Sequence, residues 1–92
     1  LVEAAAAAFG GLDVVVNNAG LNVRRSAHEA TLDEWRTVLD GNLTSTFLVS
    51  RAAHPHLQRR GGGKVINIGS MMSIFGLPLL AAYGASKGGV VQ

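Results

Sequence analysis

Gly-Leu-Asp-Val-Val-Val-Asn-Asn-Ala-Gly, residues 11–20, holds a short β-branched run between a glycine pair and an asparagine turn. Residues 12–16 are apolar on both faces of an extended chain, which favours a buried strand of a parallel sheet over an alternating surface strand. A second run of this kind, Lys-Val-Ile-Asn-Ile, occupies residues 64–68. More than forty residues of helical pattern separate the two runs. They cannot form a hairpin, so we expect a right-handed βαβ unit.

The other segments predict helices around these strands. Residues 1–9 are rich in alanine and end at a glycine pair, as a capped helix does. Thr-Leu-Asp-Glu at 31–34 has the spacing of a capping box, so a helix should begin there. A further amphipathic helix is expected over residues 43–60, bent or loosened by Pro55 and stopped by three glycines. The irregular segment 69–82 should lead into a last helix.

Composition limits the class of protein. The chain has 92 residues, of which 48% are hydrophobic, with no cysteine and a net charge of +2. This predicts one soluble cytoplasmic domain without a disulfide framework or zinc–thiolate site. No apolar run approaches the ~18–20 residues that cross a bilayer, and the start lacks a signal-peptide pattern. Because the chain begins at leucine and stops inside an expected helix, we interpret it as a fragment.

Several charged residues allow a functional and a plain interpretation. The arginine pairs at 24–25 and 59–60 are not interleaved with aromatics, which favours solvated positions over a nucleic-acid surface. His54 and His56 flank a proline, and His28 precedes a glutamate, but no metal-ligand set is apparent, so we predict surface residues. The first arginine pair follows the 17–20 turn, which leaves open a hypothesis that it meets an anionic substrate such as a sugar acid.

Tyr83 and Lys87 stand four residues apart, which places them on one face of the last helix. A free tyrosine has a pKa of about 10, so a phenolate at neutral pH needs roughly 4 kcal/mol of stabilisation. An ammonium about 4 Å away supplies roughly that energy at an effective dielectric of about 20. We therefore predict a proton-transfer site.

Ser70 lies thirteen residues before Tyr83 and follows the second strand, as residues 17–20 follow the first. Ligands of parallel α/β sheets bind outside the carboxyl ends of the strands, so both segments should reach one site. A loop chosen for unusual backbone angles is the plain interpretation of the 17–20 turn. Ser73 and Ser86 are alternatives to Ser70, and the spacing to the tyrosine favours Ser70.

These motifs, in this order and spacing, resemble the short-chain dehydrogenase/reductase family over essentially the whole chain. They are Asn-Asn-Ala-Gly at 17–20, Asn42, Ser70 and Tyr-Gly-Ala-Ser-Lys at 83–87. Residues 73–89 look most like the gluconate 5-dehydrogenase and 3-oxoacyl-reductase-like members. The resemblance implies an α/β fold, a three-layer Rossmann-like doubly wound parallel sheet. This chain would be a partial NAD(P)-binding domain with two central strands. The family's glycine-rich phosphate turn and C-terminal substrate region are not among its residues.

The resemblance also implies an NAD- or NADP-dependent oxidoreductase that interconverts a secondary alcohol and a ketone. Tyr83 would be the general acid in reduction and the base in oxidation. Lys87 would favour the ionised tyrosine and bind the nicotinamide ribose, while Ser70 would hold and polarise the carbonyl. Asn42 would interrupt its helix and position a water that links Lys87 to solvent. An asparagine that merely ends a helix is the plain alternative.

Further roles follow from the same resemblance. The backbone of Asn18, Ala19 and Gly20 would line the adenosine half of the cofactor, and Asn17 would brace the sheet. The helix over 43–60 and the last helix would form the interface of a homo-oligomer, a dimer or tetramer. The partner expected in the site is a small alcohol or ketone, with no nucleic acid or membrane. The alternative function is a non-catalytic fragment that acts only as a subunit-interaction module.

Overall fold

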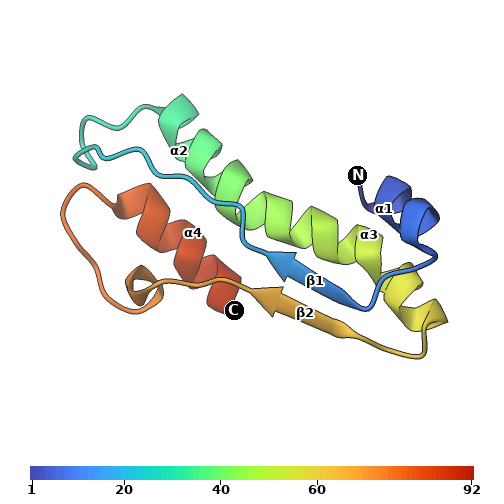
Figure 1. Ribbon diagram of the computed structural model, residues 1–92. Helices are drawn as coiled ribbons and strands as arrows, with labels where there is room; N and C mark the ends of the chain where they lie inside the picture. Colours follow the sequence, from blue (N-terminus) through green and yellow to red (C-terminus); the bar gives the residue numbers. More distant parts are fainter.

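The computed structural model describes residues 1–92 and has the expected order of elements (Figure 1). The helices and strands are α1 (Val2–Phe9), β1 (Val14–Asn17), α2 (Leu32–Leu39), α3 (Ser45–Arg59), β2 (Lys64–Asn67) and α4 (Ala81–Val91). A π-helical turn, η1 (Asp40–Thr44), joins α2 to α3, and a 3-10 turn, η2 (Met71–Ser73), follows β2. Gly10, in the left-handed conformation, ends α1 as predicted.

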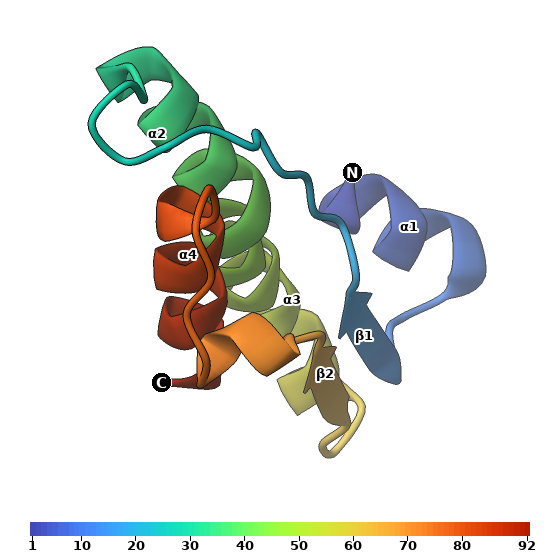
Figure 2. The ribbon, with the colours of Figure 1, turned by 90° about the vertical axis from the view of Figure 1, so that its left-hand side faces the viewer.

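The two strands pair in parallel, with Val14 opposite Lys64 and Asn17 opposite Asn67, which confirms the predicted pairing. Both strands occupy the predicted runs to within two residues. The helix α3 lies against both strands, and α1 packs on α3. The helix α3 lies along the sheet with α1 beside it, while α2 and α4 lie beyond the carboxyl ends of the strands (Figures 1 and 2). Val14 and Val16 are exposed on the other face.

The predicted boundary between two helices is a single π turn within one continuous helix. The Ser45 N–H donates to the Asp40 carbonyl, five residues back, where an α-helix would bond four residues back. At the start of α2, the Thr31 hydroxyl accepts from the Glu34 N–H and the Glu34 carboxylate accepts from the Thr31 N–H, which confirms the capping box. The helix α3 continues through Pro55 to its end.

Few side chains are buried, and half of those that are buried are polar. Eight of 92 residues are buried. Four of them are apolar and four are polar, namely Asn42, His56, Ser86 and Lys87. Three of these polar residues lie where α4 meets the π turn. Asn42, Ser86 and Lys87 thus form a buried polar junction, which is costly unless the polar groups are hydrogen-bonded.

His56 corrects a prediction, because it is buried between α1 and α3 and is not a surface residue. Its Nε2 lies 2.9 Å from Glu3 Oε2, and Arg59 Nη2 lies 2.6 Å from its Nδ1. The hydrogen bond from His56 lowers the pKa of Glu3. Arg60, expected to be solvated, makes a two-pronged ion pair with Asp13. These contacts attach α1 and the start of β1 to the end of α3.

No group of three or more histidine, cysteine, aspartate or glutamate side chains is arranged to hold a metal ion. None of the helices combines the length and apolar character that a membrane span requires.

Candidate active site

Tyr83 and Lys87 share one cleft at the carboxyl ends of the two strands. They project from α4, one helical turn apart. The cleft measures about 480 Å³, within the usual size range of small-molecule sites. Residues that directly follow β1 and β2 line the rest of it: Asn18, Gly20, Leu21, Asn22, Ile68 and Gly69. The structure thus brings the ends of both strands to the tyrosine and lysine, as predicted.

Lys87 is buried, with 5% of its surface exposed. Its Nζ donates a 2.8 Å hydrogen bond to the Ile68 carbonyl and lies 5.9 Å from the centre of the Tyr83 ring. A buried ammonium is costly unless it is bonded, and this bond fixes it above the end of β2. An ammonium has three N–H donors, so two remain for a ligand in the cleft.

Asn42 connects three elements around this lysine. It is almost fully buried, and its Oδ1 accepts from the Leu21 N–H at 2.7 Å while its Nδ2 donates to the Leu21 carbonyl at 2.9 Å. Nδ2 also donates to Ser86 Oγ at 3.0 Å, and Ser86 Oγ donates to the Tyr83 carbonyl at 2.8 Å. Asn42 lies in the π turn, where the α-helical pattern of hydrogen bonds changes between α2 and α3. Its side chain ties the loop after β1 to α4.

Gly20 approaches two buried polar side chains closely. A Cβ at this position would lie 3.2 Å from Asn42 Oδ1 and 3.6 Å from Lys87 Nζ. The missing side chain therefore lets the loop approach the buried polar groups. Ala19 does not line the main cleft and instead lines a second hollow, which it shares with Asn18. Of the three residues expected to contact the cofactor through their backbone, only Asn18 and Gly20 reach the cleft of Tyr83 and Lys87.

Asn17 braces the sheet, as expected. Its Nδ2 donates to Asn67 Oδ1 on β2 at 2.9 Å and to Ser50 Oγ on α3 at 3.0 Å. One side chain therefore fixes both strands and the helix that covers them, just before the chain enters the cleft.

Ser70 is the N-cap of η2 and follows Gly69, which lines the cleft, but Ser70 is not itself one of the lining residues. Its Oγ accepts a hydrogen bond from the Met72 N–H at 3.1 Å. A hydroxyl carries one donor and two acceptor sites, so this contact leaves the O–H free to donate. The bond from Met72 also orients the oxygen and favours donation by its hydrogen.

The hydroxyl hydrogens of the two alternative serines, Ser73 and Ser86, are both used in hydrogen bonds to main-chain carbonyls. Ser73 Oγ donates to the main-chain carbonyl of Lys87 at 2.8 Å, and Ser86 Oγ donates to that of Tyr83. Of the three candidates, Ser70 is the one whose hydroxyl hydrogen is not used in a hydrogen bond within the protein. Sequence spacing and hydrogen bonding therefore favour the same residue.

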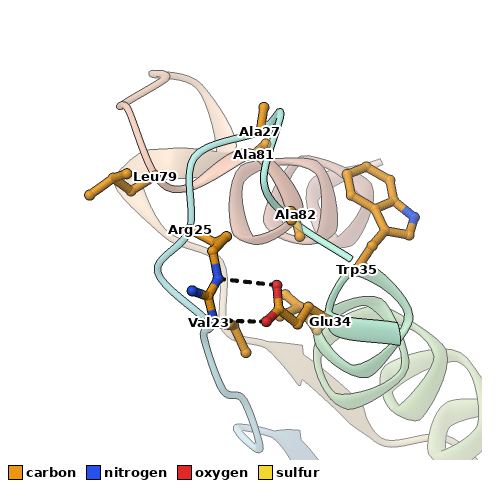
Figure 3. A pocket seen from close by; sticks show the side chains of 10 residues that line it. Val23, Arg25, Ala27, Glu34, Trp35, Leu79, Ala81 and Ala82 are labelled. Carbon is orange, nitrogen blue, oxygen red and sulfur yellow. Dashed lines mark hydrogen bonds and ion pairs between the residues drawn. The ribbon is translucent and has the colours of Figure 1, made fainter. Parts of the chain in front are cut away.

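Arg25 and Arg24, grouped together in the sequence, differ in the structure. Arg25 makes a two-pronged ion pair with Glu34, at 3.3 Å from Nε and 2.9 Å from Nη2 (Figure 3). The hydrogen bonds from Arg25 lower the pKa of Glu34, helped by the Thr31 N–H. The Arg25 N–H also donates to the Leu79 carbonyl at 3.1 Å. Arg25 therefore joins the loop after β1, the start of α2 and the segment before α4, while Arg24 has no ion pair.

The Arg25–Glu34 ion pair borders a small hollow between the loop after β1, α2 and the segment before α4 (Figure 3). The hollow measures about 100 Å³, and most of its lining is apolar, from Val23 and Trp35 to Leu79. It is separate from the cleft of Tyr83 and Lys87, with which it shares no lining residue.

The fold and the site together define a class, the Rossmann-like α/β proteins that place a tyrosine and a lysine at the carboxyl ends of parallel strands. The sequence profile described as short chain dehydrogenase matches residues 1–92. The chain belongs to the short-chain dehydrogenase family, which confirms the resemblance seen in its motifs. The family uses NAD or NADP, the cofactors expected from the sequence.

Proteins similar to this chain include several dehydrogenases. The chain is 46% identical over 89 residues to trans-4-hydroxycyclohexanecarboxylate dehydrogenase of Sinomonas cyclohexanicum, covering 97% of this chain and 34% of that protein. It is 45% identical over 92 residues to 2-dehydro-3-deoxy-D-gluconate 5-dehydrogenase of Escherichia coli K12. That match covers 99% of this chain and 36% of the E. coli protein. The crystal structure of a gluconate 5-dehydrogenase from Burkholderia cenocepacia J2315, in complex with NADP and tartrate, superposes with a TM-score of 0.92. It is 37% identical, and the match covers 97% of this chain and 35% of that one. The chain thus spans about a third of the length of these relatives.

Proposed function

We propose that residues 1–92 are the central part of an NAD(P)-dependent oxidoreductase that interconverts a secondary alcohol and a ketone. The observation that carries this proposal is the cleft in which Tyr83 and Lys87 meet the ends of both parallel strands. The family assignment supports the reaction class. The whole protein would hold the remaining parts of the cofactor and substrate sites.

The residues of the cleft fit part of a nicotinamide dinucleotide. Lys87 has two free N–H donors for ribose hydroxyls, and Gly20 leaves the floor of the cleft open beside it. The backbone of Asn18, Ala19 and Gly20 would contact the adenosine half. When bound, the nicotinamide supplies or accepts the hydride.

The side chains then have separate tasks in proton transfer. In reduction, Tyr83 delivers a proton from its hydroxyl to the carbonyl oxygen, and in oxidation it takes the proton from the alcohol. Ser70 donates its free hydroxyl hydrogen to the same oxygen, which polarises the carbonyl in the ground state and stabilises negative charge as it develops. Lys87 stabilises the deprotonated tyrosine. Asn42 would hold a water that passes protons between Lys87 and solvent.

Isotope transfer tests the reaction class. The whole protein, given a secondary alcohol with deuterium on the carbinol carbon and oxidised NAD or NADP, should produce a ketone and a monodeuterated nicotinamide. Mass spectrometry of the reduced cofactor measures the label. Ketone formation without label in the cofactor would contradict hydride transfer, and no turnover over a broad panel of secondary alcohols would contradict the proposed function.

The two arginines after the first strand refine the substrate proposal. The relatives from E. coli and B. cenocepacia are named for sugar acids. Arg25 is occupied by Glu34, whereas the guanidinium of Arg24 is exposed and unpaired. We therefore propose that an anionic substrate, if the whole protein takes one, is bound by Arg24 and not by Arg25.

Arg24→Ala should raise KM for a sugar-acid substrate by roughly tenfold to a hundredfold, the value of one charge-assisted hydrogen bond. KM for a neutral secondary alcohol should stay the same. Arg25→Ala is the matched control: it should leave KM for the sugar acid unchanged and lower the melting temperature by less than Glu34→Ala, which also removes the capping-box bond to the Thr31 N–H. Equal changes on anionic and neutral substrates with Arg24→Ala would remove the anion-binding role.

The whole protein is also proposed to be a homo-oligomer, a dimer or tetramer, assembled through α3 and α4. Two large apolar side chains of α3, Phe47 and Leu48, are exposed in this chain. Burial of such side chains is a usual driving force of assembly.

A further inference from the structure

Ser73, whose hydroxyl is not available to a substrate, makes two hydrogen bonds that link the proposed catalytic elements. Its Oγ accepts from the Ser70 N–H at 3.1 Å and donates to the Lys87 carbonyl at 2.8 Å. One hydroxyl thus connects the backbone of Ser70 directly to the backbone of α4. We propose that Ser73 is a positioning residue that sets Ser70 at the correct distance from Tyr83. This inference rests on the proposed function.

The need for such a link comes from the topology. Ser70 follows β2, whereas Tyr83 and Lys87 belong to α4, and the intervening residues 74–80 form neither helix nor strand. The bond from Lys87 Nζ to Ile68 holds the end of β2, two residues before Ser70. It does not hold Ser70 itself. The backbone of Ser70 is held toward α4 by the hydroxyl of Ser73.

The packing of η2 on α4 makes this bond possible. The turn, orange in Figure 2 between β2 and α4, lies against the helix at Gly84 and Gly88, which are one helical turn apart. A Cβ at Gly84 would lie 3.6 Å from the Met72 carbonyl, and one at Gly88 would lie 3.7 Å from the Ser73 carbonyl. The turn therefore lies so close to the glycine face of α4 that a Cβ there would be in ordinary van der Waals contact with its backbone. At this approach a serine hydroxyl spans the remaining gap.

The arrangement also has a chemical consequence for Ser70. Its N–H donates to Ser73 Oγ, its carbonyl accepts from the Ser73 N–H at 2.9 Å, and its Oγ accepts from the Met72 N–H, so all three of these hydrogen bonds lie within the turn. The hydroxyl hydrogen is the remaining donor and is left for the substrate. If the bond from Ser73 Oγ to the Lys87 carbonyl were lost, the turn could rotate relative to α4 and move this donor. Misplacement of about 1 Å at a reacting centre can lower the rate by about a hundredfold.

The test is a double-mutant cycle in the whole protein, with ketone reduction as the assay. Ser73→Ala should lower kcat by about tenfold and leave the dissociation constant of the dinucleotide unchanged. Ser70→Ala should lower kcat by more than that. The double variant should be no slower than Ser70→Ala alone, because Ser73 acts through Ser70. Ser73→Thr, which keeps the hydroxyl, should restore most of the activity.

Controls separate positioning from stability. Ser26→Ala removes an exposed hydrogen bond to Glu29 away from the cleft and should leave kcat unchanged. If Ser73→Ala does not fold, Ser73→Cys, of nearly the same size but with a weak donor, takes its place in the cycle. A tenfold loss that persists in the Ser70→Ala background, or no loss at all, would overturn the inference. Normal activity of Ser70→Ala would instead overturn the proposed function.

Discussion

Tyr83→Phe in the whole protein is expected to lower kcat by at least about a hundredfold, because it removes the group that transfers the proton. Phenylalanine keeps the ring, and Tyr83 is only half-buried, so the substitution should not disturb the packing of α4. The buried bonds that organise the site come from Asn42, Ser86 and Lys87 and do not use the tyrosine hydroxyl. The variant should therefore fold normally and fail at the chemical step.

Affinity for the dinucleotide is the internal control of this experiment. It should fall by no more than about tenfold, the value of one neutral hydrogen bond, since Lys87 and the backbone after β1 remain in place. Stopped-flow measurement of a single turnover, fluorescence titration of the cofactor and a thermal melt together separate the three effects. Turnover near that of the unmodified protein would contradict the acid–base role. A parallel loss of cofactor affinity and turnover would assign Tyr83 to binding.

The parts of the fold that could be predicted from the sequence are those set by short local motifs or by the order of segments along the chain. Two apolar runs separated by helical sequence leave parallel pairing as the simple solution, and Thr31 with Glu34 specifies its own helix start. The π turn was predicted only as an interruption at Asn42. The choice between a broken helix and a π turn depends on tertiary bonds from Asn42 to Leu21 and Ser86, which no local propensity encodes.

Some features of the site could likewise be predicted from the sequence, and others could not. Helical spacing predicted that Tyr83 and Lys87 lie side by side. The rule that ligands bind at the carboxyl ends of parallel strands predicted that both strand ends reach these two residues. The burial of His56 and the pairing of Arg25 with Glu34 could not be predicted, because each depends on which loop or helix faces the residue. Ser73 stands three residues after Ser70, a spacing that suggests a helix cap. Its bond to α4 requires the three-dimensional contact.

Residues 1–92, produced alone, are expected to show no cooperative thermal unfolding and no measurable binding of a nicotinamide dinucleotide. Only eight residues are buried. The radius of gyration is 15.3 Å, against about 12 Å for a compact domain of this length. The accessible surface is 6090 Å², against roughly 5,000 Å² for a folded protein of this mass. The chain buries too little apolar surface to offset the entropy of ordering its backbone.

The sheet adds a second reason for this instability. Two strands form a marginal sheet, and all four residues of β2 are exposed. Val16 and Ile66 lie on the uncovered face next to open strand edges, which favours aggregation. Some helix should remain, because the capping box at Thr31 starts a long continuous helix through the π turn. Circular dichroism should therefore report helix without a sharp melt, while sedimentation should report mixed aggregates.

The full-length E. coli relative, which shares 45% identity with this chain, is the matched control and should melt cooperatively under the same conditions. A monodisperse preparation of residues 1–92 that melts cooperatively and binds the dinucleotide would contradict the prediction. That outcome would mean that the polar junction of Asn42, Ser86 and Lys87 stabilises the fold with little help from an apolar core. The expected outcome means that these bonds position groups within a fold that other segments must complete.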